Sequence, residues 1–193
     1  NDKKVILTAQ IGEYLFDLHK ANFSVNVNLY DTLSTLTSDT LIYYRKLDKA
    51  IATDNVKIVD KENIIEADSL THFRTTQITH GFNNIRIENK ANNTVIYGDH
   101  IEDYRLDDFS VIDINPILIQ IDTSSTNSKQ NKELDSANIT ALIDSISLSD
   151  STAALKDSIR IDTLIIKSKV MEAFRGNINL FIARDSVEII RGG

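Results

Sequence analysis

The sequence predicts an all-β protein built from repeated strand pairs, and three observations support this fold class. Short segments alternate apolar and polar residues and are rich in Val, Ile and Thr, which is typical of half-buried strands. Two such segments recur along the chain, each about 30 residues from its next copy. Glycine (6) and proline (1) are scarce among the 193 residues, so Asn, Asp, Ser and Thr are expected to make most turns.

The first recurring segment is expected to be the returning strand of each of five units. A small residue is followed four positions later by an aliphatic residue, and by another two positions after that. The aliphatic pairs are Val25 and Val27, Val56 and Ile58, Ile85 and Ile87, Ile117 and Ile119, and Val187 and Ile189. The turn-forming pairs that precede them are Asp54-Asn55, Asn83-Asn84, Asn115-Pro116 and Asp185-Ser186. Such polar side chains are costly in a dry core without partners, so a stacked bend is predicted here.

The second segment precedes the first by about 20 residues and is expected to be the outgoing strand. It has an apolar residue, a small residue followed in most copies by Asp, an aliphatic residue and an aromatic residue. The aliphatic positions are Leu41, Leu70, Ile101 and Met171, and the aromatic positions are Tyr44, Phe73, Tyr104 and Phe174. The apolar phase changes parity at the small residue, which predicts a second bend or bulge.

Stacked bends would give a folded sheet with one continuous apolar interior. The periodicity is compatible with stacked hairpins and with a parallel solenoid, and it does not assign a face to the aromatic residues.

Residues 123–160 interrupt the repeat and are interpreted as an insertion within a single domain spanning residues 1–193. Within the insertion, Ile139, Leu142, Ile143 and Ile146 follow helical spacing, so a short helix and an irregular excursion both remain open.

Composition excludes several classes of function. The formal net charge of −7 and the lack of a basic stripe argue against a nucleic-acid partner. Cysteine is absent, which removes disulfides, thiolate catalysis and zinc–thiolate sites. Among the four histidines, His72 and His80 were the pair considered for a metal, but no third ligand has clear spacing. The sequence therefore predicts no catalytic residue, no metal and no cofactor.

The repeats resemble the OstA-like proteins, relatives of the periplasmic lipopolysaccharide-transport components LptA and LptC. The resemblance is carried by residues 67–73, 97–104 and 183–189 and covers nearly the whole chain apart from the insertion. It implies a β-jellyroll, folded like a taco from two antiparallel sheets, and a periplasmic location. It also implies a non-catalytic role in a transport bridge to the outer membrane. The expected partners are lipopolysaccharide or another lipid, and other such domains or further copies joined end to end by strand addition.

Matching the repeat to this family implies a hydrophobic groove for lipid acyl chains. The groove residues would be Val25, Val27, Leu41, Val56, Ile58, Leu70, Ile85, Ile87, Ile101, Ile117, Ile119, Met171, Val187 and Ile189. From the residues alone, the same side chains could pack against each other in the sealed core of a structural spacer or adhesin-like module. Exposed Tyr or Phe platforms would instead indicate a carbohydrate-binding module.

Overall fold

The protein is one antiparallel sheet whose long strands are bent near their middle. The structure, a computed structural model, describes residues 5–125, 159–175 and 180–192. Its elements are β1 (Ile6–Thr8), β2 (Ile11–Leu15), β3 (Lys20–Tyr30), β4 (Ser34–Tyr44), η1 (Arg45–Leu47), β5 (Lys49–Asp60), β6 (Asn63–Phe73), β7 (Ile78–Asn89), β8 (Thr94–Tyr104), η2 (Arg105–Asp107), β9 (Phe109–Ile114), β10 (Ile117–Ser125), β11 (Ile159–Lys167), β12 (Val170–Phe174), β13 (Leu180–Arg184) and β14 (Glu188–Gly192). The predicted all-β class is confirmed, and stacked hairpins rather than a parallel solenoid form the sheet.

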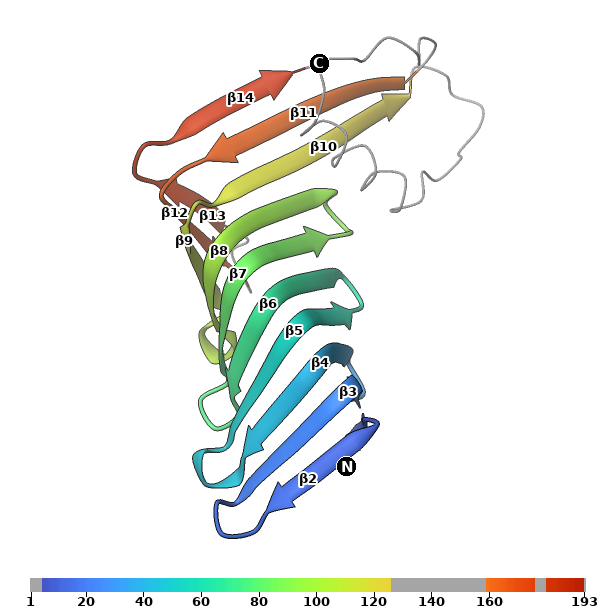
Figure 1. Cartoon of the computed structure of the whole chain (residues 1–193). Helices are drawn as coiled ribbons and strands as arrows, with labels where there is room; N and C mark the ends of the chain where they lie inside the picture. The colour runs from blue at the N-terminus through green and yellow to red at the C-terminus, as the bar shows by residue number, and fades with distance from the viewer. Residues whose placement is uncertain (1–4, 126–158, 176–179, 193) are drawn as a thin grey trace.

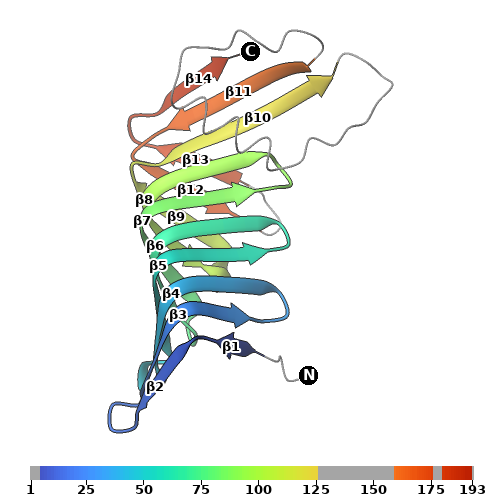
Figure 2. The same cartoon turned by 45° about the vertical axis from the view of Figure 1, so that its right-hand side comes forward.

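The sheet is folded into two limbs that share their long strands. Strands β3 to β8 are 11 or 12 residues long and run through both limbs (Figure 1). Limb 1 is the half that also contains β2, β9, β12 and β13, and limb 2 is the half that also contains β1, β10, β11 and β14. Figure 2 shows the long strands turning from one limb into the other along a common line, here called the corner.

The corner is made by consecutive residues in the left-handed backbone region. The residues with positive φ at the corner are Val25, Asn26, Asp54, Asn55, Asn83, Asn84, Asn115, Asp185 and Ser186. In each long returning strand the pairing register shifts across the pair, as between Thr53 and Val56. Asn and Asp adopt this conformation more readily than most residues with a side chain. The bends predicted at the turn-forming pairs are therefore present.

In three of the units, one hydrogen bond links the corner to an Asp of an outgoing strand. The side-chain amide Nδ2 of Asn donates to Asp Oδ2 in the pairs Asn55–Asp39 (2.7 Å), Asn84–Asp68 (2.8 Å) and Asn115–Asp99 (3.0 Å). The Asp that follows the small residue in three of the outgoing strands is thus the acceptor of this bond. These six residues are here called the corner ladder.

The two faces of limb 2 differ in chemistry. On the outer face, Lys57 Nζ lies 2.8 Å from Glu66 Oε1, and Arg86 reaches Glu66 at 3.3 Å and Glu88 at 2.8 Å. Burial alone would raise the pKa of Glu66, but the bond from Lys57 and the charges of Lys57 and Arg86 lower it on balance. The inner face, which looks toward limb 1, is aliphatic. The outer face is charged around Glu66, but nearer the C-terminal end it carries a separate apolar cluster of Val95 and Ile121, with Tyr97 and Ile119 packed against it.

Residues 139–146, for which a short helix and an irregular excursion were both left open, lie outside the described residues. Of the insertion at 123–160, the first residues belong to β10 and the last to β11, which pair with each other from Ile117 and Lys167 to Ser125 and Ile159. In the described part of the chain, no helix is long and apolar enough to cross a membrane.

Candidate binding site in the folded sheet

The interior begins at the corner with tightly packed side chains. Val27, Val56 and Ile85 of limb 2 are each 1% exposed and belong to one apolar cluster with limb 1. Across limb 1, the row that faces them alternates large and small residues from Leu41 through Ala52, Leu70 and Gly81 to Ile101, and Ile112 continues it on β9. A Cβ at Gly81 would lie 2.6 Å from Ile101 Cγ2 and 2.9 Å from Leu70 Cδ2. The corner is therefore filled by the protein's own side chains.

A second aliphatic row runs along limb 2, two residues farther from the corner. Leu36, Ile58, Ile65, Ile87 and Ile96 are paired in register across β4 to β8, and all five are half-buried. Directly opposed residues of paired strands project to the same side of a sheet, so these side chains form a continuous surface. The same register extends the row at both ends. The complete row, here called the aliphatic wall, consists of Leu7, Leu29, Leu36, Ile58, Ile65, Ile87, Ile96, Leu118, Ile166 and Ile189.

The corresponding inner row of limb 1 carries polar groups. It contains Tyr43, His72, Thr79, Asp103 and Ser110. His72 Nδ1 lies 2.9 Å from Thr79 Oγ1, and the Ser110 hydroxyl donates to Asp103 Oδ1 at 2.7 Å. Burial lowers the pKa of His72, and the nearby arginines add to this effect. The interior thus has an apolar floor at the corner, an aliphatic wall on limb 2 and a polar row on limb 1.

Nine of the fourteen predicted groove residues lie in this interior at two different depths, and a tenth, Ile189, lies at the exposed end of the aliphatic wall. Seven are buried at the corner or beside it: Val27, Leu41, Val56, Leu70, Ile85, Ile101 and Met171. Ile58 and Ile87 are half-buried and belong to the aliphatic wall. The deeper residues pack against one another and stabilise the fold. The shallower ones have accessible surface that a ligand could cover.

The first unit begins two residues later than the prediction places it. Val25 is 43% exposed and has a φ of 64°, so it is a corner residue and not an interior one. Val25 and Asn26 occupy the left-handed positions that Asp54 and Asn55 occupy in the next unit. The inward-facing residue of this unit that corresponds to Val56 is therefore Val27.

In the fourth unit, the inward-facing residues lie one position away from those that the repeat predicts. Ile117 and Ile119 oppose Tyr97 and Val95 on the outer face of limb 2, and Leu118 opposes Ile96 on the aliphatic wall. Pro116 follows the left-handed Asn115 directly and is almost fully buried. It takes the inward position that Val56 and Ile85 have in their units. An advance of one residue transfers every later side chain of a strand to the other face.

The last predicted pair lies at the open end of the sheet. Val187 is 47% exposed and Ile189 is 63% exposed. Ile189 opposes Ile166 and so continues the aliphatic wall, and among the described strands β14 pairs only with β11. These residues are exposed at the edge of the described sheet, beyond which no described strand lies.

Sequence reasoning missed most of the aliphatic wall. Leu36, Ile65 and Ile96 are the first apolar residues of the outgoing pattern, yet they were not included among the groove residues. Each of these three residues lies in the limb 2 part of its strand, directly opposite an inward-facing residue of the adjoining strand. Assigning these residues to the inner face requires the strand register. The bulge at the bend reverses the inward–outward alternation between this first apolar residue and the aliphatic residue that follows it.

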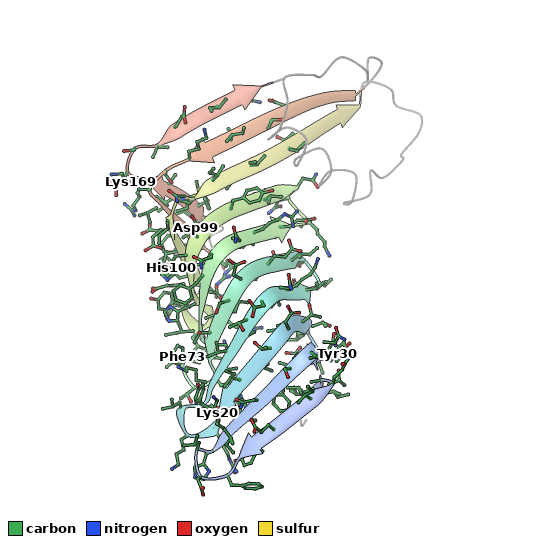
Figure 3. All side chains as sticks on the ribbon, viewed as in Figure 1. Lys20, Tyr30, Phe73, Asp99, His100 and Lys169 are labelled. Carbon is green, nitrogen blue, oxygen red and sulfur yellow. The ribbon has the colours of Figure 1, made fainter. Side chains whose placement is uncertain are left out.

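The structure assigns the recurring aromatic residues to the outer face of limb 1. Tyr44, Phe73, Tyr104 and Phe174 are each next to an inward-facing residue and in register with one another and with Phe109. The ring centroid of Phe109 lies 5.8 Å from that of Tyr104 and 5.0 Å from that of Phe174. In Figure 3, Phe73 and His100 lie along the same margin of the ribbon. These rings do not line the interior.

Comparison with known proteins gives a partial likeness to solved structures. No protein-family model matches the chain, and neither does any curated protein sequence. Among solved structures, the chain is similar to LptH from Pseudomonas aeruginosa, described as the LptA-homologous periplasmic component of the lipopolysaccharide transport device. The two chains are 12% identical, the TM-score is 0.47, and the match covers 53% of this chain and 77% of LptH.

Proposed function

We propose that this protein is a non-catalytic lipid carrier that shields lipopolysaccharide acyl chains in the interior of its folded sheet. The observation that carries the proposal is the aliphatic wall, which is continuous from strand to strand and half-buried beside a filled corner. Burial of each CH₂ group of a lipid chain is worth about 0.8 kcal/mol. A chain lying along the wall would cover this surface without displacing the residues that hold the fold.

The polarity of the interior suits an amphiphile. The wall from Leu36 to Ile96 offers no hydrogen-bonding side chain, so an acyl chain could slide along it without breaking specific bonds. The row with His72, Thr79 and Asp103 on limb 1 offers donors and acceptors to a polar group at the same level. Lipopolysaccharide as the ligand and the periplasm as the location follow from the resemblance of the repeat motifs.

End-to-end association is part of the proposal. In the described chain, β1 and β2 pair only with β3 at one end, and β13 and β14 each have one partner at the other. Leu180, Val187, Ile189 and Ile190 are all exposed at the C-terminal end. An open sheet edge with exposed aliphatic residues favours strand addition by another domain. Stacking in this way would continue the aliphatic wall from one copy into the next.

A sealed spacer is the second candidate function, because the corner is already filled. The fluorescence of tryptophan distinguishes the two, since the chain contains no Trp of its own. We expect lipopolysaccharide to shift the emission of Ile87→Trp to shorter wavelength with saturation, because the indole would leave water for an acyl environment. Lys57→Trp, on the outer face of limb 2, is the matched control and should not respond.

An emission change of the same size at both positions, or at neither, would contradict the carrier and favour the spacer. Circular dichroism of both variants checks that each is folded before lipid is added. A response to oligosaccharides without acyl chains would instead favour the carbohydrate module, with Tyr44, Phe73 and Tyr104 as its platform. These rings lie on the outer face of limb 1, where such a ligand would have access.

A further inference from the structure

Three potential metal ligands meet on the outer face of limb 1, away from the interior. His80 on β7 is directly opposite Glu102 on β8, and His100 precedes Glu102 by two residues on the same face. Ile101, between His100 and Glu102, points into the apolar core. The side chains of His80, His100 and Glu102 are 27%, 17% and 30% exposed, so ions in solution can reach them.

The ligand atoms are close enough to share one ion. His80 Nδ1 lies 3.4 Å from Glu102 Oε1, His100 Nε2 lies 4.0 Å from the same oxygen, and one ligand atom from each residue lies within 4.8 Å of the others. Ligands bound tetrahedrally to zinc at about 2.0–2.1 Å are about 3.3 Å apart. Small side-chain rotations would therefore close the site around an ion.

Neighbouring groups orient two of the three ligands. His100 Nδ1 is 2.6 Å from Asp113 Oδ1, and an ionised carboxylate can only accept, so Nδ1 carries the proton and Nε2 presents its lone pair toward Glu102. The hydroxyl of Tyr104 donates to Glu102 Oε2 at 2.5 Å, which leaves Oε1 for the ion. Histidine ligands of metals are commonly held by a carboxylate in this way.

We propose that His80, His100 and Glu102 bind a divalent transition-metal ion, with Zn²⁺ as the preferred ion. Two imidazoles and one carboxylate form a ligand set that zinc uses with a fourth position left for water, whereas Ca²⁺ and Mg²⁺ prefer oxygen ligands alone. The rings of Phe73 and Phe82 flank the site, with centroids 5.8 Å from His80 and 5.1 Å from His100. The site is independent of the lipid proposal, because it lies on the opposite face.

The proposal departs from the sequence-based expectation that the chain binds no metal. The histidine pair considered there, His72 and His80, is separated by the sheet, because Thr71 rather than His72 opposes His80. His100 and Glu102 belong to another strand. Only the register of β7 against β8 brings them to His80.

Isothermal titration of the full chain, without a polyhistidine tag, tests the site with ZnCl₂ in excess Mg²⁺. We expect one saturable equivalent. His80→Gln and His100→Gln should weaken binding by at least about 10-fold, and Asp113→Asn, which keeps all three ligands, by about 10- to 100-fold. His72→Gln, on the inner face of the adjoining strand, is the matched control and should bind as the unaltered chain does.

The absence of saturable Zn²⁺ binding would overturn the proposal, and so would binding that is unchanged in both His80→Gln and His100→Gln. Histidine NMR signals of the unaltered chain provide a test that needs no folded variant. Zn²⁺ should shift the ring signals of His80 and His100 and leave those of His19 and His72 in place. Shifts confined to His19 or His72 would contradict the assignment.

Discussion

The corner ladder predicts a specific ranking of substitutions at Asn84. This residue is exposed, has a φ of 50°, and donates to Asp68 at 2.8 Å. Ala disfavours the left-handed region by about 1 kcal/mol relative to residues that tolerate it. Loss of the exposed hydrogen bond costs about 0.5–1 kcal/mol. Asn84→Ala should therefore lower the free energy of unfolding by about 1.5–2 kcal/mol.

Two further variants separate these contributions. Asn84→Gly keeps the left-handed backbone and loses the hydrogen bond, so we expect a smaller loss of about 0.5–1 kcal/mol. Asp68→Ala removes the same bond from its other side and should give a similar loss. The double variant Asp68→Ala/Asn84→Gly should cost little more than either single change, because both remove one interaction.

Urea unfolding at 25 °C, followed by circular dichroism, measures these differences from the midpoint and slope of each transition. If Asn84→Gly destabilises the protein as much as Asn84→Ala, the left-handed backbone does not set the cost at this position. If Asp68→Ala has no effect, the corner ladder contributes no stability. Either result would refute the reasoning that explains why Asn and Asp recur at the bends.

Three other predictions concern the core, the pH response and the open end. Ile85→Ala should lower the free energy of unfolding in urea by about 2–5 kcal/mol, because Ile85 is 1% exposed and a cavity would remain. Burial lowers the pKa of His72 in the folded protein, so this histidine binds a proton more readily in the unfolded chain. The free energy of unfolding should therefore fall as the pH drops below about 6.5, the ordinary pKa of histidine. His72→Gln should then flatten the dependence of the melting temperature on pH between 7 and 5.5, and an unchanged slope would contradict this. Ile189→Lys, at a side chain that is 63% exposed, should reduce self-association in sedimentation velocity without lowering the melting temperature.

The strands and bends could be predicted because each has a local cause. Alternating aliphatic residues predict strands, and pairs such as Asn83-Asn84 adopt the left-handed conformation that the corner requires. The errors arose where one residue type serves two purposes. Pro116 was interpreted only as a turn former, but it is also a buried apolar residue in the inward position. Val25 was interpreted as an interior aliphatic, but it lies at the bend.

The sites depend on pairing, which no local pattern supplies. The face of Tyr44 and Phe73 follows from their register with neighbouring strands, and the meeting of His80 with Glu102 follows from the offset of β7 against β8. Each offset is determined by all the side chains of two strands together. A one-residue shift of β7 against β8 would separate His80 from Glu102 and place the two side chains on opposite faces of the sheet.

The repeated bend determines the direction in which a ligand can lie. The limbs are closest at the corner, where residues as small as Ala52 and Gly81 are needed between Leu41, Leu70 and Ile101. Under the proposed function, an acyl chain would therefore lie beyond this row, against the aliphatic wall, with its long axis across the strands. From β4 to β8 the wall extends about 19 Å, at about 4.8 Å per strand. A single acyl chain would then contact successive units rather than one strand, so its affinity should depend on the number of stacked units more than on any one residue.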